Sequence, residues 1–220
     1  MKGLLIKDIK LLKNQGKTLI ITLFVLGIVW GAMNANPLTI VSYVTVILAI
    51  FTVSTISYDE YENCYLFLFT LPVTRKQYTV EKYVFTLLLV VGAWLISMAV
   101  GIVIWAVQGM ETSLSEVVLG GCLIAPIALL FDSVLIPVRL KFDGERGKLV
   151  IPIVAGGVAL LVVCIYQILE KIPGNVLGDL VAAANRLGVG ELGAIFGVAA
   201  VVALIISFLC SMHVMEKKEF

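Results

Sequence analysis

Hydrophobic residues lie along the chain in six long runs that are separated by more polar segments. The runs are 18–33, 37–57, 83–107, 117–138, 149–169 and 192–212. Five of them have 21 to 25 residues, close to the roughly 20 that a helix needs to cross about 30 Å of hydrocarbon. The first has only 16 residues and is short for a span unless Lys17 extends its side chain towards the headgroups. The pattern predicts six transmembrane helices.

Helix-start signals stand beside three of these runs. Asn36-Pro37 places a capping side chain before a proline at the first helical position. Thr74-x-x-Gln77 and Ser113-x-x-Glu116 match the capping-box pattern, in which two side chains satisfy each other's backbone N–H groups. The three signals support the placing of the second, third and fourth helices.

Positive charge is distributed very unevenly between the loops on the two sides. One side holds 14 of the 16 Lys and Arg residues, and the other holds only Lys171 and Arg186. Cytoplasmic loops of membrane proteins carry the excess of Lys and Arg. We therefore expect both termini in the cytoplasm. The even number of spans agrees, because it places both termini on the same side of the membrane.

The first 17 residues predict an amphipathic helix in the inner membrane interface. On a helical wheel one face carries Leu4, Leu5, Ile9, Leu11 and Leu12, and the other carries Lys7, Lys10, Lys13 and Lys17. A signal peptide is excluded because the basic part is long and a second apolar run follows at once. Two roles remain open for this helix, a simple topology anchor and packing against a partner.

Composition excludes an ordinary soluble enzyme. Apolar residues make up 60% of the chain and charged residues 14%, against about 45–50% and about 25% in soluble domains. The six runs take up 126 of the 220 residues. The remainder leaves no room for a soluble ATPase or catalytic domain.

Candidate catalytic chemistry is sparse. The single histidine, His213, lies at the edge of the last run, which argues against a zinc protease or a Ser-His pair. Gly16-Lys17-Thr18 lacks the first glycine of a phosphate-binding loop, because position 11 is Leu11. Four cysteines are scattered without metal or redox spacing, and we interpret them as apolar packing residues: Cys64, Cys122, Cys164 and Cys210.

Asp132 is the one ionisable residue that the pattern places inside a run. Intramembrane charges often mark functional sites. Two interpretations stay open, a buried hydrogen-bond partner and a residue that lines a vestibule facing the cytoplasm.

Small residues four apart predict close helix packing, and these pairs are Gly27/Gly31, Ser97/Gly101 and Gly193/Gly197.

Two loops on the side rich in Lys and Arg have a more regular sequence pattern than a simple connection between helices needs. In 58–82, aromatic residues recur at helical spacing and predict a short amphipathic helix that ends at Leu71-Pro72. Arg75 and Lys76 then stand in the first turn of the next helix, where the helix dipole disfavours positive charge. This conflict suggests an external anionic partner, lipid phosphate or an acidic protein surface. Residues 137–148 are expected to form a loop of mixed charge. For both segments the alternative is an ordinary solvated loop that binds no partner.

The same residues carry a resemblance to a known family. Leu71-Pro72-Val73-Thr74-Arg75, followed by Tyr78, Val80 and Lys82-Tyr83, resembles the signature of type-2 ABC exporter permeases. The branch is the one that contains bacitracin-type and phenol-soluble-modulin exporters. A second stretch of that branch is matched by Pro137, Lys141, Phe142, Glu145, Arg146 and Gly147, with Asp143 in place of the usual glycine.

The resemblance implies one all-α permease domain over residues 1–220, in a bacterial plasma membrane. It would dimerise with a second copy or a paralogue and bind two cytoplasmic ATP-binding subunits. ATP and magnesium would belong to those subunits, and this chain would hold no catalytic residue, metal or cofactor. Segment 58–70 would be the coupling helix and 170–191 an external helical cap. The expected ATPase contacts are Tyr58, Asp59, Glu60, Tyr61, Glu62, Tyr65, Leu71, Pro72, Arg75, Lys141, Glu145 and Arg146.

The leading hypothesis is therefore the membrane subunit of an ATP-driven exporter for an amphipathic or hydrophobic cargo, such as a peptide or an antibiotic. The alternative is an ion- or proton-coupled secondary transporter, which would call for more charge within the membrane and an internal repeat. An intramembrane protease is disfavoured by the lone His213. No nucleic-acid partner is expected.

Overall fold

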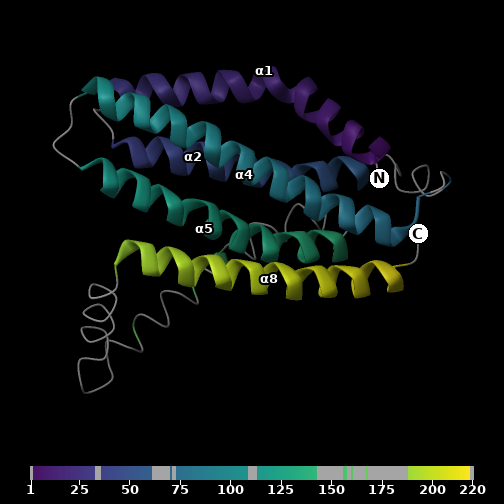
Figure 1. The fold of residues 1–220 in the computed structure, drawn as a ribbon. Coiled ribbons are helices and arrows are strands. Elements are labelled where there is room, and N and C mark those ends of the chain that lie inside the picture. The colour runs from purple at the N-terminus through teal and green to yellow at the C-terminus, as the bar shows by residue number, and fades with distance from the viewer. Residues whose placement is uncertain are drawn as a thin grey trace, which may run out of the picture.

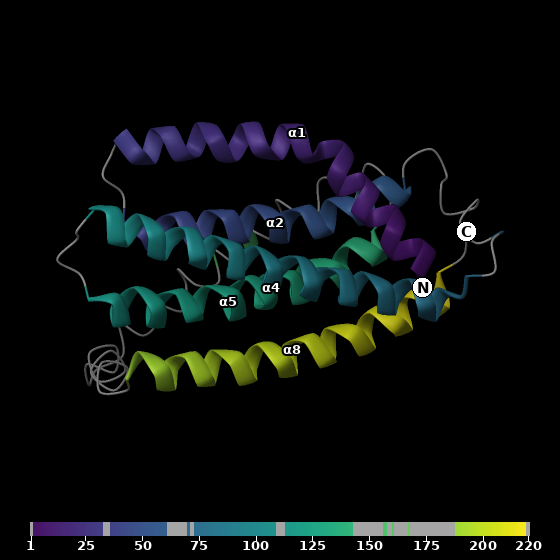
Figure 2. The same cartoon turned by 45° about the horizontal axis from the view of Figure 1, so that its top comes forward.

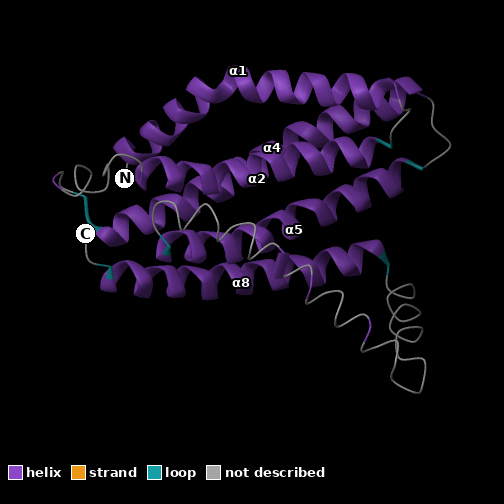
Figure 3. Ribbon diagram, turned by 180° about the vertical axis from the view of Figure 1, so that it is seen from behind, coloured by secondary structure: helices purple, strands orange, loops and turns teal. Residues whose placement is uncertain are grey.

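The computed structural model describes residues 2–32, 36–60, 70, 73–108, 113–142, 156–157, 160, 167 and 188–218. The described residues form long helices and no strand (Figure 3). The helices are α1 (Lys2–Ala32), α2 (Pro37–Glu60), α4 (Arg75–Gln108), α5 (Leu114–Lys141) and α8 (Val189–Lys217). The start of α1 and the end of α8 lie at one end of the bundle, which we call the terminal end (Figure 1). The end of α2, the start of α4 and the end of α5 lie there too.

Four described helices are long and apolar enough to cross a membrane. They span Pro37–Asp59, Arg75–Val107, Leu114–Lys141 and Gly190–Lys217. They contain the second, third, fourth and sixth runs, and each extends beyond its run because polar residues continue the helix at its ends. The described part of the chain is thus an all-helical membrane bundle.

The other expected segments are placed differently or lie outside the description. The first run and the expected interfacial segment belong to one helix, α1, which bends part-way along its length (Figure 2). Of the fifth run, 149–169, only residues 156–157, 160 and 167 are described, and these are helical. The expected cap lies outside the described residues except for its last residues, 188–191, where α8 begins.

The three helix-start signals are confirmed. The backbone N–H of Gln77 donates to Thr74 Oγ1, and that of Thr74 donates to Gln77 Oε1, both at 3.2 Å. Ser113 Oγ accepts from the N–H of Glu116 at 3.3 Å. Asn36 Oδ1 accepts from the N–H of Leu38 at 3.0 Å. Local sequence therefore sets where α2, α4 and α5 begin.

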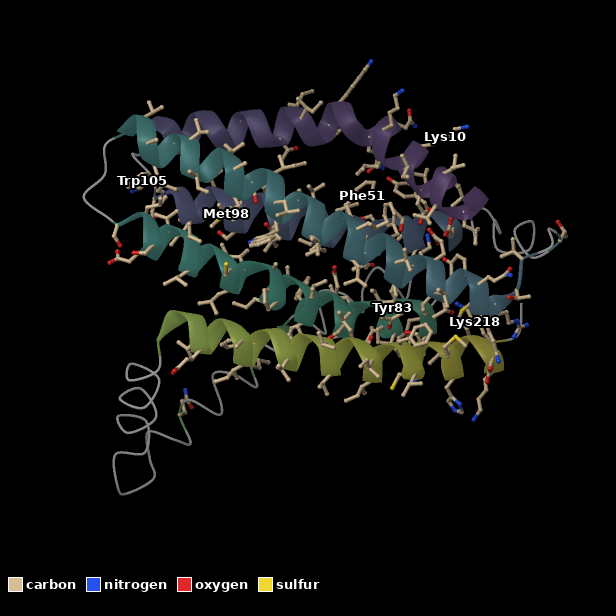
Figure 4. All side chains as sticks on the ribbon, in the orientation of Figure 1. Lys10, Phe51, Tyr83, Met98, Trp105 and Lys218 are labelled. Atoms are coloured by element: carbon tan, nitrogen blue, oxygen red, sulfur yellow. The ribbon has the colours of Figure 1, made fainter. Side chains whose placement is uncertain are left out.

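Small residues let α2, α4 and α5 approach closely in the middle of the bundle. Ala49, Val90 and Ala128 form a buried cluster between them. A methyl group added at Gly121 would lie 2.5 Å from Met98 Sδ, and one added at Gly101 would lie 3.0 Å from a methyl of Val41. Figure 4 shows Met98 between α4 and α5.

The predicted small-residue pairs divide into two kinds. Ser97 and Gly101 face α2, where Ser97 Oγ lies 3.4 Å from Thr45 Oγ1, so this pair packs helices within the chain. A methyl group added at Gly193 or Gly197 would meet no atom within 4 Å among the described residues outside its own turn of helix. The side chains around Gly27/Gly31 lie outside the description.

The five long helices of the described residues meet in an apolar cluster at the terminal end. One or two residues from each contribute, and the members are Leu4, Ile56, Tyr78, Tyr83, Ile136, Leu140 and Met215. This cluster holds the first turns of α1 against the ends of the other four helices. A group of buried charged residues lies beside this apolar cluster.

Candidate functional site: a buried charge cluster at the terminal end

Five charged residues from α1, α2 and α4 lie together beside this apolar cluster. We call Lys7, Asp8, Asp59, Glu81 and Lys82 the charge cluster. Asp8 and Glu81 are 0% exposed, Lys82 is 1% and Asp59 is 2%. Charges removed from water this completely are stable only when they are paired and hydrogen-bonded.

Lys82, in the second turn of α4, is the centre of the cluster. Its Nζ lies 2.5 Å from Asp8 Oδ2 and 2.8 Å from Asp59 Oδ2. It also donates to Thr55 Oγ1 at 3.3 Å. One ammonium group therefore joins α1 and α2 to α4, and its three donors are used within the protein.

Asp59, at the end of α2, receives three donors. Its Oδ1 accepts from Lys7 on α1. Its Oδ2 accepts from Tyr78 at 2.9 Å as well as from Lys82. Because Tyr78 and Lys82 are both on α4, this carboxylate ties together the two helices that flank residues 61–74.

Glu81 differs from the other two acids. Neither of its carboxylate oxygens has a hydrogen-bond partner among the described residues, and Lys82 Nζ is 3.9 Å away. The cluster holds three carboxylates and two ammonium groups, so one acid is in excess within the part of the chain described. No group of three His, Cys, Asp or Glu residues there is arranged to hold a metal ion.

A second set of polar contacts fixes the C-terminal ends of α5 and α8. Arg75 Nη1 donates to the carbonyls of Met215 and Glu216 at 3.0 and 3.1 Å. Lys218 Nζ donates to the carbonyl of Leu140 at 2.8 Å. The last carbonyls of a helix lack partners within it and carry partial negative charge, so a cation stabilises them.

Tyr83 links α4 to α8. Its hydroxyl shares hydrogen bonds with Ser207 and Ser211, at 2.5 and 2.8 Å, and its ring packs edge-on against Phe208. Figure 4 shows Tyr83 between the two helices, near the terminal end.

The residues expected to contact an ATPase have different surroundings. Tyr58 is exposed and accepts a hydrogen bond from Gln15. Asp59 is buried in the charge cluster, Arg75 caps α8, and Lys141 is exposed at the end of α5. Outside the described residues lie Tyr61, Glu62, Tyr65, Leu71, Pro72, Glu145 and Arg146, and so does the side chain of Glu60.

Asp132 is buried in α5. Its Oδ2 accepts from Thr52 Oγ1 of α2 at 3.3 Å, and its Oδ1 has no partner among the described residues. The first of its two interpretations, a buried hydrogen-bond partner, describes this contact.

The helical wheel of the N-terminal segment placed Lys7 on one face with the other lysines and Ile9 on the opposite face with the leucines. The contacts with the bundle do not follow this division. Lys7 instead binds Asp59, while Ile9 is exposed and the unremarked Asp8 is fully buried. The buried ionic contacts turn the helix so that Leu4 and Asp8, one turn apart, face the bundle.

One comparison with known proteins decides the family. The model of a family described as "ABC-2 family transporter protein" matches residues 3–216 of this chain. The chain belongs to the ABC-2 transporter family. It is therefore a membrane permease component of an ABC transporter, a component that is typically non-catalytic. Searches of curated proteins and of solved structures give no match.

In this ABC-2 permease, most polar residues of the signature stretch make intramolecular contacts. Thr74 caps α4, Arg75 caps α8, Tyr78 and Lys82 bind Asp59, and Tyr83 binds α8. Sequence reasoning predicted the cap at Thr74. It singled out Tyr78, Lys82 and Tyr83 only by resemblance and missed what they bind. One local signal was available, because Asp8 is the only acid in a strongly basic segment.

Proposed function

We propose that this ABC-2 permease is the membrane subunit of an ATP-driven exporter. A separate cytoplasmic ATP-binding subunit binds ATP and magnesium and pushes on segment 58–70, which acts as the coupling helix. The observation that carries the proposal is the family match over nearly the whole chain. The uneven distribution of Lys and Arg supports a cytoplasmic location for both termini, and hence for the terminal end.

The charge cluster supports the proposed route of coupling. Asp59 lies near the start of the coupling segment, at the end of α2, and Tyr78 and Lys82 lie beyond the segment, in the first two turns of α4. Their contacts join the helices on either side of the segment through buried charge-assisted hydrogen bonds. A displacement of the segment would therefore move α2 and α4 together. The contact between Lys82 and Asp8 would transmit this movement to α1.

The proposal extends to the assembly and its cargo. Two permease copies, or this chain and a paralogue, form the path between them, in the branch of bacitracin-type and phenol-soluble-modulin exporters. An apolar path suits an amphipathic or hydrophobic cargo such as a peptide or an antibiotic. Asp132, buried within α5, is a candidate for the vestibule role. Asp132→Asn should then lower transport without loss of assembly, and normal transport would exclude that role.

The test is co-purification from the native membrane. The detergent-solubilised chain should bring down an ATPase, and the variant Glu60→Lys/Glu62→Lys should lose it, because two acids on the coupling segment become cations. Glu116→Lys/Glu191→Lys is the matched control. It makes the same charge change in the first turns of α5 and α8, at the opposite end of the bundle, and should retain the ATPase.

The alternative function makes opposite predictions. A secondary transporter should purify without an ATPase and should support uptake driven by a proton gradient in liposomes that contain this chain alone. Loss of the ATPase from both charge variants would also refute the proposed docking segment, because the effect would then not depend on position.

A further inference from the structure

A basic pocket lies between the C-terminal ends of α5 and α8. It is a cavity of about 360 Å³ lined by Lys141, His213, Val214, Lys217 and Lys218. Four of these five residues are basic, and none is acidic. Its volume lies within the range of small-molecule pockets, about 300–1,000 Å³. Figure 4 shows Lys218 at this end of α8.

Capping of helix ends accounts for only part of this positive charge. Lys218 donates to the carbonyl of Leu140 and so neutralises part of the end of α5. Lys141 and Lys217 are exposed, and neither forms a salt bridge with an acid in the described part of the chain. The pocket is therefore bordered by two further lysines and a histidine, in addition to Lys218.

The surface next to the pocket is apolar. Leu209, one turn before His213 on α8, is 62% exposed, and Ile206 is 57% exposed. These residues continue a line of exposed apolar side chains along the helix, which includes Val198, Val202 and Ile205. A ligand with an anionic head and an apolar tail would satisfy both surfaces at once, whereas a free anion or an acidic protein would satisfy only the first.

We propose that this pocket binds the phosphate group of an anionic phospholipid, with the acyl chains along α8. Basic pockets between transmembrane helices on the cytoplasmic side suit anionic headgroups, because lysines attract the phosphate where the hydrocarbon ends. The site requires only that α8 spans the membrane. It is therefore independent of the proposed exporter function and of any ATPase.

Native mass spectrometry of the detergent-solubilised full chain tests the proposal. Phosphatidylglycerol and phosphatidylcholine are titrated separately, and the lipid-bound fraction gives an apparent Kd. The wild type should prefer phosphatidylglycerol. Lys141→Gln/Lys217→Gln should weaken that binding by roughly 10- to 30-fold and leave the phosphatidylcholine titration unchanged. Lys218 is kept in this variant because its contact with Leu140 is structural.

The control variant is Lys10→Gln/Lys13→Gln, which removes two exposed lysines from α1 near the same end. It should change the Kd by less than about twofold. An equal loss in both variants would overturn the pocket, since diffuse positive charge would then explain the preference. An unchanged Kd in the pocket variant would overturn it as well.

Two further arms identify the source of the phosphate. Soluble glycerol phosphate should bind far more weakly than phosphatidylglycerol, and equal affinities would mean a site for free phosphates instead of a lipid. If the pocket variant loses a co-purifying ATPase but keeps its lipid affinity, the pocket docks protein and the proposal fails. Thermal unfolding should confirm that the variant remains folded, because both substituted side chains are exposed.

Discussion

The substitution Asp59→Asn should undock the first turns of α1. The amide keeps the shape of the side chain and one acceptor, but removes the charge that Lys7, Lys82 and Tyr78 all bind. A hydrogen bond to a charged group contributes about 1.5–3 kcal/mol and a neutral one about 0.5–1.5. Three weakened bonds therefore predict a loss of roughly 3 kcal/mol, in line with the cost of breaking a buried ion pair.

Thermal unfolding of the detergent-solubilised protein measures this loss. For a chain of this size about 3 kcal/mol corresponds to a fall of roughly 6–12 °C in Tm. Limited trypsin digestion should show faster cleavage at Lys10 and Lys13 as α1 leaves the bundle. Tyr58→Phe is the matched control, because the Tyr58 hydroxyl also joins α1 and α2 but is exposed, and it should shift Tm by less than 2 °C.

Glu81→Gln should behave in the opposite way. This side chain is fully buried, has no hydrogen-bond partner among the described residues and is the acid in excess. Its replacement by the amide should leave the free energy of unfolding unchanged or raise it by about 1 kcal/mol, since the cost of burying a carboxylate whose closest cation is 3.9 Å away is removed. If Asp59→Asn is as stable as the wild type, or Glu81→Gln is the less stable of the two variants, the assignment of roles within the cluster is wrong.

Two other contacts give matched pairs. Gly121→Leu should lower the free energy of unfolding by at least about 1–3 kcal/mol, since even a methyl group there overlaps a neighbouring side chain, whereas Gly92→Leu, which meets open space, should be nearly neutral. Equal thermal stability of these two variants would contradict the close packing of α4 and α5. Arg75→Gln should cost about 1–2 kcal/mol and speed amide hydrogen exchange in the last turn of α8. Lys76→Gln breaks only an exposed salt bridge of 3.6 Å and should cost less than about 0.5 kcal/mol.

The helical bundle could be predicted from the sequence because its signals are local. Hydrophobic runs locate the four membrane-spanning helices of the described residues, and capping residues such as Thr74 and Ser113 mark where two of them begin. The charge cluster could not be predicted in this way. Lys82 lies 74 residues from Asp8 and 27 from Thr55 along the chain. Asp59, Glu81 and Lys82 lie at the edges of hydrophobic runs, and Lys7 and Asp8 lie in the basic N-terminal segment. In both places a solvated charge is the usual interpretation.

Arg75 shows how a correct local observation can have a different physical answer. A cation in the first turn of a helix opposes that helix's own dipole, and the sequence suggested an external anionic partner. In the structure the guanidinium binds the C-terminal carbonyls of α8. The dipole of α4 repels this charge, but the dipole of α8 attracts it, and only the tertiary structure brings the two helix ends together.

The charge cluster also sets an order for assembly in the membrane. Because α1 and α2 are synthesised before α4, Lys7 is the only cation of the cluster that is present when Asp8 and Asp59 have just been made. Lys82 arrives with the third hydrophobic run, and only then can α1 and α2 be joined through buried charge. A chain that ends before residue 82 has the acids but not their shared cation. The cluster therefore distinguishes a chain in which α4 has joined α1 and α2 from one in which it has not, and its closure ties α1 to both helices.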